Sequence, residues 1–106
     1  MKRTMAFLCI MGIAAVVSPF MAYAEYQISI ASFAFDPPTL TVKEDSTVTW
    51  TNQDSAPHTI VSDAGDWESG QVDQGQSYSH AFAQAGTFTY HCSIHPSMKG
   101  TIIVTQ

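Results

Sequence analysis

The chain has 106 residues, of which 45% are hydrophobic and 12% charged, and its nine acidic residues outnumber its four basic ones to give a formal net charge of −5. A chain of this length can form one small domain with a thin hydrophobic core. The acidic balance argues against nucleic acid or an anionic membrane surface as a partner.

The first 24 residues predict a secretory signal peptide. Two basic residues precede an apolar run from Met5 to Val17, and Ala22-Tyr23-Ala24 matches the A-x-A pattern of a cleavage site. An uncleaved membrane anchor is the alternative, because the segment approaches the roughly 20 residues of a spanning helix. Pro19 and the cleavage pattern favour removal after Ala24. We therefore expect an exported domain of residues 25–106, which keeps two Lys and all nine acids for a net charge of −7.

Apolar and polar residues then alternate with a period of two, and no stretch of this segment keeps the period of a helix. Such alternation predicts strands that bury one face. Seven or eight short strands separated by turn residues are typical of an all-β fold, an antiparallel β-sandwich. The predicted strands are residues 27–30, 39–42, 47–51, 58–62, 76–82, 87–92 and 99–105.

The irregular stretch from Asp63 to Gly75 carries four acidic residues, which raises the question of calcium. It lacks the D-x-D-x-D-G order and the closing Glu of a calcium loop. We expect a solvated surface loop here.

Three potential metal ligands follow one predicted strand: Cys92, His95 and Met98, in the run Cys-Ser-Ile-His-Pro-Ser-Met. Steps of three residues, stiffened by Pro96, allow a thiolate, an imidazole and a thioether to converge on one ion. His58, at the start of another predicted strand, is the candidate for the fourth ligand. Two His, one Cys and a weak axial Met are the ligands of a blue-copper electron-transfer site. The sequence therefore predicts one copper ion that cycles between Cu(II) and Cu(I).

Strand alternation places two of these ligands inside the same end of the sandwich. Cys92 has the parity of the apolar Phe88 and Tyr90, and His58 has the parity of the next apolar residue in its strand. Export would remove Cys9 and leave Cys92 as the single thiol, which cannot form an intramolecular disulfide. Metal ligation gives this exported cysteine a role.

Other interpretations of the ligand set remain open. Structural zinc usually has four Cys or His ligands, and a thioether is a poor zinc ligand. A copper carrier or buffer without redox cycling would expose several Met ligands, whereas Met98 is the single Met beyond the signal. A copper enzyme would need a second metal site, for which His80 and His91 remain, on opposite strand parities. We expect His80 to be partly buried and hydrogen-bonded, and His91 to be a surface residue.

Four segments, Pro57 to Val61, Tyr78 to Phe82, Ala85 to Cys92 and His95 to Gly100, resemble those of the small single-domain cupredoxins. The short Cys-x-x-His-x-x-Met loop is most similar to that of the amicyanins. The resemblance implies a Greek-key β-sandwich and an electron carrier, not an enzyme, in the bacterial periplasm. The implied ligands of its type 1 copper are His58, Cys92, His95 and Met98.

The same resemblance implies how electrons leave. A monomer would dock briefly, through the exposed edge of His95 and an apolar patch of Pro57, Ile94 and Pro96, against a redox enzyme and an acceptor such as a cytochrome. Many cupredoxins have Asn directly after the first ligand His, where this chain has Thr59. We expect the Thr59 hydroxyl to bond toward Ser93 and to tie the two ligand loops together.

Overall fold

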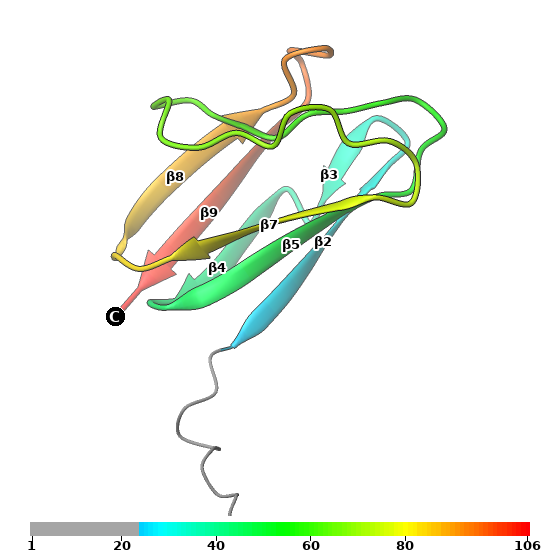
Figure 1. Ribbon diagram of the computed structural model, residues 1–106. Coiled ribbons are helices and arrows are strands. Elements are labelled where there is room, and N and C mark those ends of the chain that lie inside the picture. Colours follow the sequence, from blue (N-terminus) through cyan, green and yellow to red (C-terminus); the bar gives the residue numbers. More distant parts are fainter. Residues whose placement is uncertain (1–23) are drawn as a thin grey trace, which may run out of the picture.

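The computed structural model describes residues 24–106, so the predicted signal peptide lies outside the described residues. This range contains eight strands and no helix, and therefore no helix that could cross a membrane (Figure 1). The strands are β2 (Glu25–Ala31), β3 (Ala34–Asp36), β4 (Thr39–Lys43), β5 (Ser46–Asn52), β6 (Val61–Ser62), β7 (Ser77–Phe82), β8 (Gly86–His91) and β9 (Lys99–Thr105).

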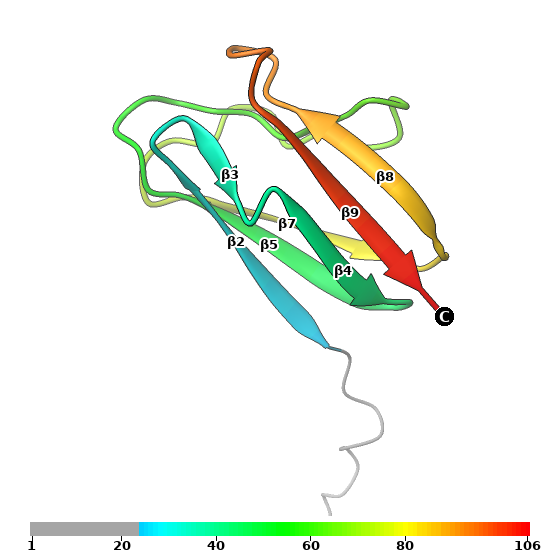
Figure 2. The ribbon, with the colours of Figure 1, turned by 180° about the vertical axis from the view of Figure 1, so that it is seen from behind.

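Two four-stranded sheets, in the orders β3-β2-β5-β7 and β4-β9-β8-β6, form a sandwich (Figures 1 and 2). The predicted all-β sandwich is confirmed, but its pairing is mixed where the sequence predicted antiparallel strands throughout. β2 pairs in parallel with β5, from Glu25↔Thr47 to Ile30↔Asn52, and β4 pairs in parallel with β9. Parallel neighbours need a crossover connection. The chain supplies one when it leaves for the second sheet as β4 and returns to the first as β5.

The core lies between the sheets, where the alternation of each strand turns its apolar face inward. In β5, Val48 and Trp50 are completely buried. The ring of Trp50 meets that of Tyr90, from β8 of the other sheet, edge to face with a centroid distance of 5.3 Å. Buried aromatic rings contribute large apolar areas, and such pairs add about 0.5–1.5 kcal/mol beyond that burial. The buried hydrophobic residues are Ile28, Ile30, Phe35, Val42, Val48, Trp50, Ile60, Val72, Phe82, Tyr90, Cys92, Met98, Ile102 and Val104.

The predicted strand at residues 58–62 is wrong over most of its length. The β6 strand keeps only the last two of these residues, whereas His58 forms an isolated antiparallel bridge with Val72. Their backbones exchange hydrogen bonds of 3.1 and 2.8 Å. Ile60 donates its N–H to the Ser69 hydroxyl at 2.8 Å. Because the loop before β7 folds back onto this segment, three consecutive residues from His58 to Ile60 are buried, and the half-exposed pattern of a strand is lost.

Three connections gather at one end of the sandwich, opposite the C-terminus (Figure 1). They are the β2–β3 turn, the green segment after β5 and the orange segment between β8 and β9. The predicted metal ligands lie in the last two of these connections or at their borders.

Candidate metal centre

The structure brings three of the four predicted ligands together. The Sγ atom of Cys92 lies 3.8 Å from Nδ1 of His58 and 3.7 Å from Nδ1 of His95. Within the part of the chain that the structure describes, these residues are the one group of three or more His, Cys, Asp or Glu side chains whose ligand atoms all lie within 4.8 Å of one another. Cys92 and His58 are fully buried, and Met98 is 4% exposed. His95 is half-buried and so reaches toward the surface.

The loop between β8 and β9 is held closed by its own backbone. Cys92 donates its N–H to the Met98 carbonyl at 3.1 Å, and Met98 donates to the His95 carbonyl at 2.9 Å. These bonds fold the three-residue steps into a tight loop with the Met98 side chain inside. Cys92 continues the inward face of β8, as the strand parity predicted.

Thr59 connects the two ligand loops. Ser93 donates its backbone N–H to the Thr59 hydroxyl at 2.7 Å, and the two hydroxyl oxygens lie 2.9 Å apart. The expected bond toward Ser93 is thus confirmed. The backbone N–H of Thr59 also points at the Cys92 sulfur, at 3.4 Å.

The surroundings of the Cys92 side chain favour its thiolate form. Burial raises the pKa of Cys92, but hydrogen bonds to the sulfur, led by that from the Thr59 backbone, outweigh it and lower the pKa to about 6. A thiolate is the form of Cys that binds metals.

The donor set fits copper. Two imidazole nitrogens and a thiolate meet at a buried point, and the loop that carries two of them also carries a buried thioether, Met98; this mixture of soft and intermediate ligands is the set of a type 1 copper site. A structural zinc site would need a fourth Cys or His. The two remaining histidines are placed elsewhere, so the residues fit copper better than zinc.

The two histidines outside the cluster are His91 and His80. His91 is a surface residue as predicted, and its Nδ1 contacts the Asp63 carboxylate at 2.6 Å. His80 is half-buried as predicted, but in place of the expected hydrogen bond its ring stacks on Trp67, with a centroid distance of 4.8 Å. The partners of these two histidines, Asp63 and Trp67, both lie in the stretch from Asp63 to Gly75. This stretch, called the acidic loop below, is mostly exposed. This arrangement does not bring the two histidines into a second cluster.

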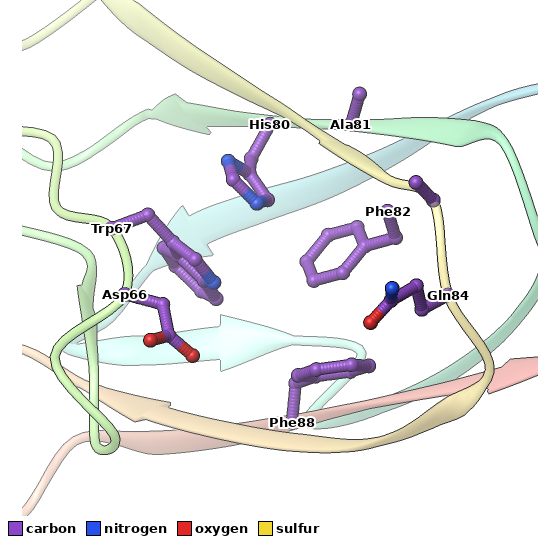
Figure 3. Close-up of a pocket in the computed structure, with 8 residues that line it drawn as sticks. Asp66, Trp67, His80, Ala81, Phe82, Gln84 and Phe88 are labelled. Carbon is purple, nitrogen blue, oxygen red and sulfur yellow. The ribbon is translucent and has the colours of Figure 1, made fainter.

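The His80–Trp67 stack borders an open hollow of about 180 Å³ between β7, β8 and the acidic loop (Figure 3). Phe82 and Phe88 form the rest of its aromatic lining, with Asp66 and Gln84 at the sides. Its lining includes none of the three clustered ligands, so it is separate from the metal centre.

Two residues beside the ligands were missed by the sequence analysis. Asp54 Oδ2 lies 2.9 Å from Nε2 of His58. The ring of Phe33, 52% exposed, stands edge-on to both imidazoles, at centroid distances of 5.2 Å to His58 and 4.8 Å to His95. The hydrogen bond from the Phe33 backbone, opposed by burial and helped by His58 and Ser32, lowers the pKa of Asp54. For Asp54 there was a weak signal in the sequence, because this acidic residue precedes His58 in the same loop. For Phe33 there was none.

Comparison with known proteins supports the assignment of the ligand cluster to a copper site. The model of the cupredoxin-like domain family matches residues 4–104. The chain belongs to this family. It is 37% identical over 82 residues to amicyanin of Paracoccus denitrificans, covering 73% of this chain and 63% of that relative. It is 38% identical over 86 residues to plastocyanin of Scenedesmus fuscus, covering 69% and 88%. The chain thus spans less than two thirds of the first relative.

Solved cupredoxin structures have the same fold. The Cu(I) form of an amicyanin mutant superimposes with a TM-score of 0.73 at 36% identity, covering 78% of this chain and 84% of the other. A purple cupredoxin from Nitrosopumilus maritimus gives a TM-score of 0.69 at 32% identity, covering 76% and 99%. These similarities confirm that the chain is a small cupredoxin similar to the amicyanins.

Proposed function

We propose that this protein is a blue-copper electron carrier whose single type 1 copper is bound by His58, Cys92, His95 and Met98. The observation that carries the proposal is the buried meeting of one cysteine sulfur with two Nδ1 atoms, at 3.8 and 3.7 Å. Bound there, the ion would supply a reversible one-electron couple between Cu(II) and Cu(I). The relatives named amicyanin and plastocyanin support this class.

Each ligand has a distinct role in the proposal. Cys92 would be the thiolate and the main covalent anchor, and the imidazoles of His58 and His95 would complete the equatorial set. Met98, buried at the end of the same loop, would be the weak axial ligand that tunes the potential. The backbone bonds that close the loop hold these groups in place, which suits a carrier that should change little between its two states.

Electrons would enter and leave at the exposed edge of His95. The docking surface in this proposal is an apolar patch of Phe33, Ile94, His95 and Pro96; Phe33 is 52% and Ile94 45% exposed. These are the two exposed large hydrophobic residues among residues 24–106. A small apolar contact suits a short-lived complex with a periplasmic redox enzyme or with an acceptor such as a cytochrome. Pro57, predicted to belong to the patch, is half-buried.

Export to the periplasm belongs to the same proposal. Cleavage after Ala24 would leave residues 25–106, whose first strand begins at Glu25. The A-x-A pattern at residues 22–24 is the support for this step. N-terminal sequencing of the protein recovered from a periplasmic extract tests it, and a protein that begins at Met1 in a membrane fraction contradicts it.

The deciding experiment is an optical and EPR spectrum of residues 25–106 loaded with one copper per chain. We expect an intense thiolate-to-copper charge-transfer band in the oxidised form, and its loss in Cys92→Ser. Wild-type protein without this band refutes the proposal. Reversible oxidation and reduction by a soluble mediator separates an electron carrier from a copper carrier or buffer, which would hold the ion without rapid cycling.

A further inference from the structure

One carboxylate outside the ligand set joins two parts of the metal end that are far apart in the sequence. Asp54 accepts hydrogen bonds from the backbone N–H groups of Ser32 at 2.8 Å and Phe33 at 2.9 Å. Its Oδ2 also contacts Nε2 of His58 at 2.9 Å. The Asp54 side chain is 15% exposed, so these contacts are largely shielded from water.

The Asp54 backbone is itself fixed. Its N–H donates to the side-chain oxygen of Asn52 at 2.8 Å, and Asn52 is fully buried at the end of β5. The neighbouring Gln53 donates to the Ile30 carbonyl of β2 at 2.7 Å. The carboxylate therefore projects from a segment that is tied to both central strands of its sheet.

The turn that Asp54 holds has an unfavourable backbone. Ser32 and Phe33 have φ angles of 54° and 58°, in the left-handed region that non-glycine residues rarely adopt because Cβ lies too close to the following carbonyl oxygen. Hydrogen bonds from both N–H groups to a carboxylate are charge-assisted and about twice as strong as neutral ones. The turn places the Phe33 ring edge-on against His58 and His95.

The contact with His58 has a chemical consequence. An ionised carboxylate only accepts hydrogen bonds, so the proton of the neutral imidazole lies on Nε2 and the lone pair on Nδ1 faces Cys92. Such an outer partner orients a ligand imidazole, fixes its tautomer and raises its basicity. A more basic imidazole favours the more highly charged Cu(II) over Cu(I).

We propose that Asp54 is the positioning residue of the metal centre, which holds the His58 imidazole in its ligand tautomer and the Phe33 ring against both histidines. The proposal rests on the copper function proposed above. Removal of the carboxylate should weaken Cu(II) binding, raise the reduction potential and loosen the β2–β3 turn together, because one side chain carries all three effects.

Asp54→Asn tests this. The amide keeps the size of the side chain but cannot accept all three hydrogen bonds. Asp54→Glu is the conservative variant for rescue. Asp63→Asn is the matched control, since it removes a carboxylate from His91, which is not a proposed ligand and points away from Cys92. We expect a 10–100-fold loss of Cu(II) affinity in Asp54→Asn. With unchanged Cu(I) affinity, each tenfold loss raises a one-electron potential by about 59 mV.

Two readouts use the metal-free protein. Nitrogen-15 NMR should show that His58 loses its single tautomer in Asp54→Asn, and the Ser32 and Phe33 amides should exchange faster with solvent. Asp54→Glu should restore part of each effect, and Asp63→Asn should match wild type in all of them. If a folded Asp54→Asn protein has the same reduction potential, His58 tautomer and amide exchange rates as wild type, the proposal is wrong. If wild-type protein binds no copper, the proposed function is wrong. The His58 tautomer and the amide exchange, both measured without metal, still test the positioning role of Asp54.

Discussion

Replacement of Asn52 should be one of the most damaging single changes outside the ligands. Its side-chain amide donates to the carbonyls of Ala56 and Val72, both at 2.9 Å, and its oxygen accepts from the Asp54 N–H at 2.8 Å. Asn52 is fully buried. Alanine would remove all three bonds and leave a small cavity. The Ala56 carbonyl and the Asp54 N–H would lose the partner that Asn52 supplies, whereas the Val72 carbonyl would keep its bond from the His58 N–H.

The expected loss follows from these contacts. Each hydrogen bond contributes about 1 kcal/mol, and more where a buried partner is left unsatisfied. Asn52→Ala should therefore lower the free energy of unfolding by about 3 kcal/mol or more, a large part of the roughly 5–15 kcal/mol of a small domain. For a domain of this size each kcal/mol corresponds to roughly 4–8 °C in melting temperature. We expect a drop of roughly 12–24 °C.

Urea and thermal unfolding of residues 25–106, metal-free and copper-loaded, measure the effect. The matched control is Ser77→Ala, which removes an exposed bond between the Ser77 and Thr51 hydroxyls and should change the free energy by at most about 0.5 kcal/mol. Asn52→Asp should be worse than alanine, because a carboxylate would face two carbonyl oxygens, and its penalty should grow with pH as it ionises. A loss below about 1 kcal/mol for Asn52→Ala would refute this account of the loop.

Two further predictions concern the core and its pH dependence. Gly100→Ala should destabilise the fold by about 1–3 kcal/mol in urea unfolding, because a Cβ there would clash with the buried Tyr90 ring. Unchanged stability would show that the ring can move aside. Burial lowers the pKa of His80, so the folded protein resists protonation, and stability should fall as pH drops below the ordinary histidine value of about 6.5. His80→Phe, which keeps a ring against Trp67, should lose less unfolding free energy than wild type between pH 7.5 and 5.5; equal losses contradict the assignment.

Much of the fold and the ligand set could be predicted because their signals are local. The period-two alternation in β5 and β9 reports one buried face, and both strands are found within one residue of their predicted ends. Cys92, His95 and Met98 lie within seven residues of one another, so the chemistry of these potential ligands can be inferred without knowledge of distant contacts. Strand parity was enough to send Cys92 inward.

The missed features depend on contacts that have no periodicity. The bonds from Asp54 to the β2–β3 turn join residues 21 and 22 positions apart, and they involve backbone N–H groups that any residue could offer. Alternation also does not say which strands become neighbours, and the parallel pairing of β2 with β5 was missed for that reason. At His58 to Ile60 the alternation misled, because a loop covers the face that should have been exposed.

These contacts also bear on how the metal centre could work. Its proposed ligands come from two loops, and two side chains of the protein bridge the connections at this end: Thr59 reaches Ser93, and Asp54 reaches the Phe33 turn. Because such bonds form within the chain itself, the ligand positions do not depend on the metal to assemble them. A site of that kind resists rearrangement when the charge of a bound ion changes by one. Loss of either bridge should therefore loosen the positions of the ligands, whereas loss of a patch residue such as Ile94 should affect only docking.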